Sequence, residues 1–335
     1  MKLKMKTYDI YVGEYEINQL ETYIKSFYQY KDIYIVTDET VHHIYRDLMI
    51  EKLSQFNLHF CVVKPGETSK SFKTYIETTE KLIDLNMKRN HLLIALGGGV
   101  IGDLTGFIAA TLYRGVNYIQ VPTTLLAQVD SSIGSKVGID LKSGKNLLGS
   151  FYDPKFVLID PTFLKTLSDR EYRQGIAEMI KAGLIANKEL YNFFKSHEKV
   201  TENEILLALQ VKRDVVLKDP FDLNERMILN FGHTFGHAIE KKFNYETYKH
   251  GEAISYGMLL AIKIGIAKKI TPGYIYEDVK SVLKKHHLIE EPYFEEKDLV
   301  DYIKTDKKHM ANTFHFICLN DIGSSVITNL KVGEF

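Results

Sequence analysis

The sequence predicts an α/β domain built on a mainly parallel sheet, followed by a mostly α-helical domain. Three observations support this fold class. The chain has 335 residues, which exceeds the usual size of one domain. In its first half, short β-rich runs alternate with helical stretches, as in parallel sheets covered by helices. Beyond about residue 160, strand signals become scarce and long helical patterns dominate.

Four β-rich runs, each ending in turn or cap residues, are expected to be strands of the first domain. They are Ile33–Thr37, Leu58–Val63, Leu92–Leu96 and Tyr118–Val121. A further apolar run, Phe156–Ile159, precedes the break at Asp160-Pro161. Ser168 followed by Glu171 is a capping-box signature that opens a long helix. We therefore expect a first domain over residues 1–164 and a second over 165–335.

The composition limits the kinds of partner. Hydrophobic residues make up 45% of the chain and charged residues 26%, and 43 basic residues balance 43 acidic ones. This composition is typical of a soluble globular protein, and the neutral total disfavours a general surface for nucleic acids or anionic membranes. Neither a signal peptide nor a membrane span is indicated, so we expect a cytoplasmic protein. Cys61 and Cys318, far apart in the chain, are expected to be packing residues.

A glycine-rich turn follows the expected strand Leu92–Leu96. The segment Gly97–Asp103 matches G-x-G-x-x-G between a strand and a helix, where glycine admits a pyrophosphate close to the backbone. The acidic residue expected about 20 positions downstream is absent, which argues against the standard dinucleotide fold but not against a Rossmann-like one. Asp38, at the end of another strand, could bind a ribose hydroxyl instead. A turn without a ligand is the less favoured alternative, because consecutive glycines cost conformational entropy.

Two later segments place charged groups among glycines. Asp130 and Lys136 lie in the first, and Lys145 and Asn146 in the second; both segments are interpreted as loops or helix ends. Loop lysines flanked by glycine suit phosphate, because backbone amides can join the ammonium groups around the anion. A solvated, flexible hairpin is the alternative, which we accept for Lys142.

A narrow polar stripe marks the segment from Arg226 to Glu240, which is interpreted as one largely buried helix. At about 100° per residue, four polar side chains fall within roughly 60° of one another: Arg226, Asn230, His233 and His237. A buried row of such groups, facing a cavity, indicates a site. Satisfied core histidines beside a solvated arginine are the alternative, which the alignment of four polar groups makes less favourable.

Glu178 and Lys181 lie three residues apart in the helix that Ser168 opens. A surface ion pair is the commonest explanation for this spacing and contributes little to stability. Together with the polar stripe, however, Glu178 is a candidate metal ligand beside His233 and His250. Catalytic zinc commonly takes three protein ligands from histidine and carboxylate and keeps one position open. The three residues come from separate segments, so their spacing leaves both interpretations open.

Six motifs, in order over nearly the whole chain, resemble those of the 3-dehydroquinate synthase family. They are Gly97–Asp103, Val121–Ser132, Gly144–Asn146, Ala177–Lys181, Leu229–Glu240 and His250–Glu252. Their combination is far more specific than any one motif. The resemblance implies an N-terminal nucleotide-binding domain, a helical C-terminal domain, and a cleft between them that holds NAD and a divalent metal. Zinc is the usual metal, with cobalt as an alternative, and the family forms homodimers.

The resemblance also implies a reaction, the second step of the shikimate pathway. A small sugar-acid phosphate, 3-deoxy-D-arabino-heptulosonate 7-phosphate, becomes 3-dehydroquinate and phosphate. NAD takes a hydride, phosphate leaves by β-elimination, the hydride returns, and an intramolecular aldol reaction closes the ring. A metal can stabilise the developing alkoxide, just as zinc lowers the pKa of a bound water into the neutral range. The substrate carries a carboxylate and a phosphate, which explains a need for many cations.

Transferred position by position, the resemblance implies a role for each matching residue. The metal ligands are Glu178, His233 and His250. The NAD site comprises Asp38, Glu67, Lys70, Gly98, Gly99, Val100, Ile101, Gly102, Asp103, Thr123, Thr124, Lys136, Lys145, Phe163, Leu164, Lys165 and Thr166. The substrate site comprises Arg114, Lys136, Lys145, Asn146, Lys181, Lys212, Arg226, Asn230, His237 and Lys307, or Lys308 in its place. The catalytic residues are Asp130, Lys136, Lys181, Arg226, Asn230 and His237. Arg114 resembles an arginine that reaches the neighbouring subunit's phosphate site.

Some positions carry other residues than those usual in the family. Other functions also remain as alternatives. Ser135 and Val137 flank Lys136 where Gly and Thr are more familiar, and Tyr152-Asp153 lies where His and Gln are common. These departures concern the nucleotide contacts. Other sugar-phosphate cyclases, such as 2-deoxy-scyllo-inosose synthase, use substrates without a carboxylate. A glycerol-type metal-dependent dehydrogenase and a non-catalytic NAD-binding protein are further alternatives.

Overall fold

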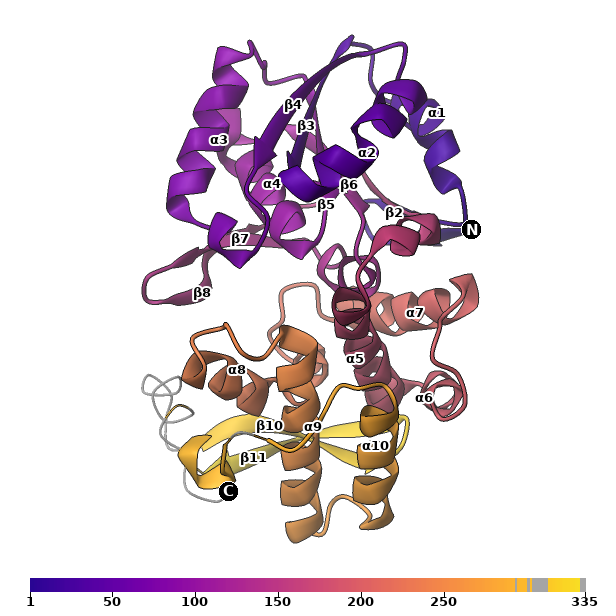
Figure 1. Cartoon of the computed structure of the whole chain (residues 1–335), viewed down its shortest axis with the longest axis vertical. Coiled ribbons are helices and arrows are strands. Elements are labelled where there is room, and N and C mark those ends of the chain that lie inside the picture. The colour runs from indigo at the N-terminus through magenta and orange to yellow at the C-terminus, as the bar shows by residue number, and fades with distance from the viewer. Residues whose placement is uncertain (293, 300–301, 303–312, 332–335) are drawn as a thin grey trace. The chain divides into compact units, whose positions relative to one another are not determined.

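The computed structural model describes residues 1–292, 294–299, 302 and 313–331. The chain divides into two compact units, Met1–Ser168 and Asp169–Phe335, here called unit 1 and unit 2. Unit 1 combines a sheet with helices, and unit 2 is mostly helical (Figure 1). The predicted fold class is therefore confirmed.

Unit 1 contains a seven-stranded sheet in the order β1-β2-β9-β6-β5-β3-β4. Its strands are β1 (Lys2–Lys4), β2 (Asp9–Val12), β3 (Asp32–Asp38), β4 (Asn57–Val63), β5 (Leu92–Gly97), β6 (Asn117–Pro122) and β9 (Phe156–Ile159). All neighbouring pairs are parallel except β1–β2. The prediction of a mainly parallel sheet is confirmed, and β1 and β2 extend it at an edge that the sequence pattern did not indicate.

Helices cover both faces of this sheet. They are α1 (Leu20–Lys25), α2 (Glu39–Lys52), α3 (Phe72–Asp84) and α4 (Gly99–Thr111). Ile33 and Ile35 of β3 pack in one core cluster with residues of α1 and α2. Tyr34 and Val36 pack in a second cluster with residues of α3 and α4. Because both faces are buried, the central strand β5 is apolar along its length.

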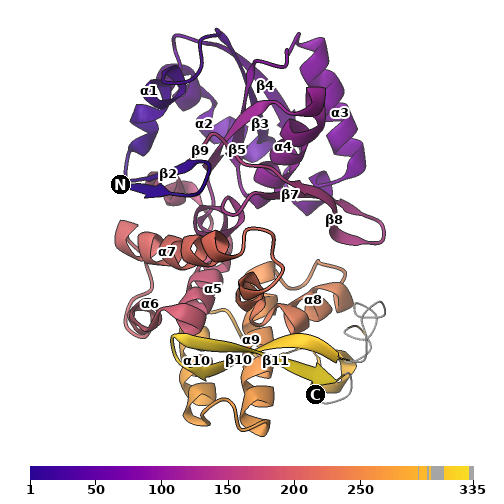
Figure 2. The same cartoon turned by 180° about the vertical axis from the view of Figure 1, so that it is seen from behind.

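A two-stranded antiparallel hairpin follows β6 and projects from the helical layer of unit 1 (Figure 2). It consists of β7 (Lys136–Leu141) and β8 (Gly144–Phe151). The first segment expected to be a loop or helix end is confirmed for Asp130, which lies in the helical segment Ala127–Ser131, although Lys136 begins β7. Lys145 and Asn146 lie in β8, so the expectation for the second segment was wrong. β8 buries no side chain fully and so lacks the alternation that marks a strand.

Unit 2 is built around one apolar helix. Its helices are α5 (Asp169–Ala186), α6 (Lys188–Phe194), α7 (Glu202–Lys218), α8 (His233–Lys242), α9 (His250–Ala267) and α10 (Tyr274–Lys285). Most of α9 is buried, and it contacts α5, α8, α10 and β10. The hairpin of β10 (Thr313–Asp321) and β11 (Ser324–Lys331) lies across α9 (Figure 2). No helix of the described residues is long and apolar enough to cross a membrane.

The expected single helix from Arg226 to Glu240 is two elements, which corrects the prediction. Glu225–Asn230 is a 3₁₀ helix, and α8 begins only at His233. Between them, Gly232 has a left-handed φ of +80°. A Cβ at Gly232 would lie 2.9 Å from Ile254 O, so glycine lets this turn lie directly on α9. The 100° spacing therefore does not carry from the 3₁₀ helix into α8.

Candidate active site

The three predicted metal ligands converge within unit 2. Glu178 lies in the middle of α5, His233 begins α8 and His250 begins α9. Glu178 Oε1 is 3.2 Å from His250 Nε2 and 3.5 Å from His233 Nε2. One ligand atom from each residue lies within 4.8 Å of the others. Glu178 is only 2% exposed, so this carboxylate sits inside the helical core.

Opposite charges surround the Glu178 carboxylate. The Lys181 ammonium contacts Glu178 Oε2 as a buried ion pair, yet that oxygen accepts no well-aligned hydrogen bond. Burial alone would raise the pKa of Glu178, but Lys181 and the two histidines hold it well below its ordinary value. Burial and the Lys181 charge hold the pKa of His233 well below its ordinary value. Burial also disfavours His250 as a cation, but Glu178 and Glu240 prevail and raise its pKa to about 10.

The donor set fits a divalent metal. One carboxylate and two imidazoles facing a common point are typical of catalytic zinc. His233 Nδ1 lies 3.2 Å from Phe231 O, a carbonyl that can only accept, so the other ring nitrogen is left for an ion. His250 Nδ1 lies 3.5 Å from Glu240 Oε1. Glu178 Oε2, which accepts no well-aligned hydrogen bond, already faces a cation, the Lys181 ammonium.

The other residues of the polar stripe do not form a buried row. Arg226 is buried, whereas Asn230 and His237 are exposed and His233 is half-buried. The Arg226 N–H donates to Asp219 Oδ2 at 3.1 Å, and Nη1 donates to Pro220 O at 2.7 Å. The ring of His237 lies 5.4 Å from that of His233. Lys212 is buried on α7.

In unit 1, the predicted glycine turn has the expected strand-turn-helix form. β5 ends at Gly97 and α4 begins at Gly99, and Val100 to Asp103 continue α4. A Cβ at Gly98 would lie 3.1 Å from Thr124 Cγ2, and one at Gly99 would lie 2.8 Å from Ser131 Oγ. The glycines therefore let this turn lie close against the side chains of the segment after β6.

Five of the residues assigned to nucleotide and substrate sites gather beside this turn. The buried Lys70 ammonium contacts both Asp103 and Asn146, and Lys145 Nζ lies 3.6 Å from Glu67 Oε1. Burial tends to lower the pKa of Lys70, but Asp103 and Glu67 raise it overall. Burial raises the pKa of Asp103 more than the Lys70 charge lowers it. Both pKa values are raised, which favours the charged form of Lys70 but the neutral form of Asp103. We treat the pair as ionised, because the direct contact is that of an ion pair.

The remaining candidates occupy scattered places. Asp38 Oδ1 accepts the N–H groups of Thr40 and Val41, at 2.9 and 3.0 Å, and so caps α2. Other predicted positions are Lys136, exposed at the start of β7; Arg114, exposed at the end of the 3₁₀ helix Leu112–Arg114; Asp130, in the π-helical segment Ala127–Ser131; Thr123, buried after β6; and Phe163 to Thr166, in the 3₁₀ helix Pro161–Thr166. Lys307 and Lys308 lie outside the described residues.

Two neighbours of the candidate site, Glu240 and Asp219, were not predicted as site residues from the sequence. Glu240 faces His250, and Asp219 accepts backbone N–H groups from Leu223, Asn224 and Arg226. Ser135 has a positive φ of 63°, and its hydroxyl donates to Asp153. Ser135 and Asp153, two residues that differ from those usual in the family, therefore contact each other. The sequence offered Glu240 only as the last residue of the motif Leu229–Glu240.

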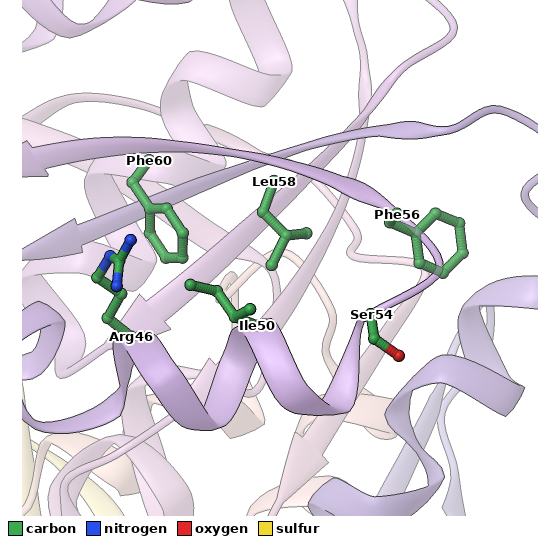
Figure 3. A pocket seen from close by; sticks show the side chains of 6 residues that line it. All are labelled: Arg46, Ile50, Ser54, Phe56, Leu58 and Phe60. Atoms are coloured by element: carbon green, nitrogen blue, oxygen red, sulfur yellow. The ribbon is translucent and has the colours of Figure 1, made fainter.

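A hollow of about 300 Å³ lies elsewhere in unit 1, between α2 and β4 (Figure 3). It is lined by Arg46, Ile50, Ser54, Phe56, Leu58 and Phe60. Its lining carries no carboxylate or imidazole, so it offers no group for proton transfer or metal binding. We therefore do not place the reaction there.

Comparisons with known proteins identify the family of the chain. Residues 60–174 match the family model "3-dehydroquinate synthase N-terminal", and residues 175–309 match "3-dehydroquinate synthase C-terminal". A protein of Clostridium botulinum (strain Alaska E43 / Type E3) named 3-dehydroquinate synthase is 43% identical over 99% of this chain and 98% of its own length.

Two solved structures have similar folds. One is 2-epi-5-epi-valiolone synthase from Streptomyces hygroscopicus subsp. jinggangensis 5008 with NAD⁺ and Zn²⁺ bound: 26% identity, TM-score 0.89, covering 99% of this chain and 95% of that chain. The other is 2-deoxy-scyllo-inosose synthase complexed with carbaglucose-6-phosphate, NAD⁺ and Co²⁺. It has 24% identity and a TM-score of 0.87, and the match covers 100% of this chain and 98% of that chain.

Proposed function

The chain belongs to the 3-dehydroquinate synthase family, and we propose that it converts 3-deoxy-D-arabino-heptulosonate 7-phosphate into 3-dehydroquinate and phosphate. The observation that carries the proposal is the convergence of Glu178, His233 and His250 in a chain whose relatives bear that name. The substrate carries a carboxylate and a phosphate, and charges cross a bilayer at high cost, which supports a cytoplasmic location.

We assign a divalent metal, zinc, to Glu178, His233 and His250. When bound, such an ion acts as a Lewis acid that stabilises negative charge on a substrate oxygen. The half-buried imidazoles and the buried carboxylate hold the ligand atoms in place beforehand, because each is fixed at a helix start or within a helix. Lys181 keeps Glu178 ionised and therefore able to bind a cation.

We assign NAD to unit 1, around the glycine turn and the residues that gather beside it. NAD supplies the hydride acceptor and donor that the reaction needs. The N-terminus of α4 offers N–H groups to a pyrophosphate, and Lys70 and Lys145 offer ammonium groups. Support comes from the valiolone synthase of similar fold, which was solved with NAD⁺ and Zn²⁺.

We assign substrate binding mainly to unit 2. The Arg226 guanidinium can grip a carboxylate through two N–H groups, and Lys212 and Lys181 act as point charges. His237 is exposed one turn after His233, so it can hydrogen-bond a substrate oxygen or move a proton. The buried guanidinium of Arg226 suits a carboxylate, which the heptulosonate phosphate carries and a glucose phosphate lacks, and this favours the carboxylated substrate.

We also propose a homodimer in which Arg114 completes the partner's phosphate site. Arg114 is exposed, and on the hairpin Leu147 and Phe151 are 60% and 43% exposed, so unit 1 offers apolar surface for a partner. Mixing Arg114→Ala chains with inactive His250→Ala chains tests this. A mixed dimer should regain part of the activity if the arginine acts in the neighbour, and none if it acts in its own chain.

A phosphate-release assay tests the proposed reaction. The metal-free protein is supplied with zinc, NAD and the heptulosonate phosphate, and phosphate and 3-dehydroquinate are measured together with NADH. We expect one phosphate per product and no net NADH. Turnover of glucose 6-phosphate would favour an inosose synthase, NADH accumulation with glycerol would favour a dehydrogenase, and NAD binding without turnover would favour a binding protein.

A further inference from the structure

The start of α9, which carries His250, faces a row of three side chains on α5. Arg170, Gln174 and Glu178 are spaced four residues apart, so at about 100° per residue they span roughly 80° of the helix surface. We name these three residues the α5 clamp. Each contacts a different part of residues 247–252.

Arg170 makes the contact nearest the start of α5. Its Nε and Nη2 donate to the two carboxylate oxygens of Glu252, both at 2.8 Å, and Nη2 also donates to Thr247 O at 3.0 Å. Glu252 Oε2 in turn accepts the Lys249 N–H at 2.9 Å. Two parallel N–H···O bonds fix direction as well as distance. Arg170 therefore ties the loop before α9 to the first turn of that helix.

Gln174 makes the next contact, one turn closer to the metal ligands. Its Oε1 accepts the Gly251 N–H at 2.6 Å, and its Nε2 donates to Arg170 O at 2.7 Å. Gln174 is buried, and a Cβ at Gly251 would lie 2.8 Å from Gln174 Cα. The backbone beside His250 thus lies directly on α5, and one of the free N–H groups of the first helical turn is satisfied there.

We propose that Arg170 and Gln174 are positioning residues that hold His250 at Glu178 and so preorganise the metal centre. Glu178 is the third member of the α5 clamp, and its Oε1 lies 3.2 Å from His250 Nε2. One helix thus supplies a metal ligand and the two groups that place another. The inference rests on the proposed metal site, and it concerns the affinity for the ion rather than a chemical step.

The experiment measures zinc binding by the metal-free protein, through competition with a chromophoric chelator, and the visible spectrum of the cobalt form. Arg170→Met and Gln174→Leu remove the two positioning contacts. Partners of metal ligands typically change metal affinity by about 10- to 100-fold, and we expect a loss in this range for each variant. We also expect an altered cobalt spectrum, because the His250 ligand is no longer held in one orientation.

Two control variants separate positioning from stability. Arg173→Met makes the same change on the same helix, at a side chain without a hydrogen bond or ion pair to any described residue. Tyr191→Phe removes a 2.9 Å hydrogen bond to Asp278 in the same unit. Both controls should bind zinc like the wild type, even where Tyr191→Phe lowers the melting temperature.

Wild-type zinc affinity in folded Arg170→Met and Gln174→Leu would overturn the proposal. So would an equal loss of affinity in Tyr191→Phe at a matched melting temperature. If Arg170→Met does not fold, Arg170→Lys keeps the charge without the paired N–H groups and is judged by the same measurements. A wild-type chain that binds zinc no better than His250→Ala would instead overturn the metal site itself, and the α5 clamp with it.

Discussion

The two units hold their charged groups in different electrostatic states. In unit 1, the Lys70 ammonium contacts Asp103 and Asn146, and Lys145 faces Glu67, so opposite charges pair with one another. In unit 2, two imidazoles and an ammonium converge on one carboxylate, Glu178. A ligand of unit 1 must exchange existing ion pairs for its own contacts, whereas the donors of unit 2 already face one point. The difference shows that only the second site is preorganised for a single ion.

The candidate residues of the two units also differ in how deeply their elements are buried. Glu178 belongs to a helix whose residues from Gln174 to Ile185 are all buried, so its position is fixed by packing. Lys145 belongs to β8, a strand with no fully buried side chain. Side chains in a packed core lose their freedom before a ligand arrives, whereas exposed ones lose it on binding.

The largest effect is expected for His250→Ala, which breaks unit 2 alone. Loss of one of three protein ligands should remove the metal and with it several kcal/mol of charge stabilisation, a fall in turnover of about a thousandfold or more. Bound zinc is measured by elemental analysis, and NAD affinity by fluorescence titration. NAD binding should persist, since its residues lie in unit 1. Full turnover by verified metal-free His250→Ala would refute the ligand assignment, and exposed His43→Ala is the control.

Lys70→Met disrupts the buried ion pair of unit 1 and leaves the metal ligands of unit 2 intact. The Lys70 side chain is 6% exposed and that of Asp103 20% exposed, so the variant leaves a mostly buried carboxylate without its partner. We expect a loss of about 3 kcal/mol in the free energy of unfolding, measured by urea denaturation, together with weaker NAD binding and unchanged zinc binding. Adding Asp103→Leu should restore stability but not NAD binding. The control Lys73→Met, at an exposed side chain, should leave the free energy of unfolding unchanged. A Lys70→Met variant as stable as this control would contradict the expected role of the buried ion pair.

Gly257→Ala tests the packing that brings the helix starts of unit 2 together. A Cβ at Gly257 would lie 2.0 Å from Gly232 O, so the backbone before α8 must shift. We expect a loss of about 1–3 kcal/mol in stability, as in overpacked cores, and weaker zinc binding because His233 moves away from His250. Gly273→Ala is the matched control, since a Cβ there meets no atom within 4 Å. Equal melting temperatures for the two variants would show that this contact is not limiting.

The smallest effect concerns His286, a buried histidine of unit 2 outside the candidate site. Burial lowers its pKa, and the accepting carbonyl of Phe194, at 2.9 Å, offsets this only partly. As the pH falls below the ordinary value of about 6.5, the unfolded chain binds a proton that the folded unit resists, so stability decreases. His286→Gln should flatten this part of the melting temperature against pH. A wild-type melting temperature that rises as the pH falls below about 6.5 would contradict this prediction.

The sequence by itself determined the features that are local along the chain. Alternating β-rich runs predicted the parallel sheet, because each strand buried on both faces must be apolar. The strand-turn-helix form around Gly97–Asp103 could also be predicted, since its glycines are contiguous in the sequence. The hairpin β7–β8 could not be predicted, because β8 lacks an alternation of buried and exposed residues. The break at Gly232 could not be predicted either, because helical spacing does not reveal a single left-handed residue.

Only the tertiary structure decided which distant side chains meet. Glu178, His233 and His250 come from three helices, and spacing within one segment says nothing about distances between helices. The packing of α5 and α8 on α9, with glycine at the closest approaches, brings these ligand atoms within 4.8 Å of one another. The same packing places Arg170 and Gln174 against the start of α9. A helix surface fixes which residues share a face, and the neighbouring helix decides what that face contacts.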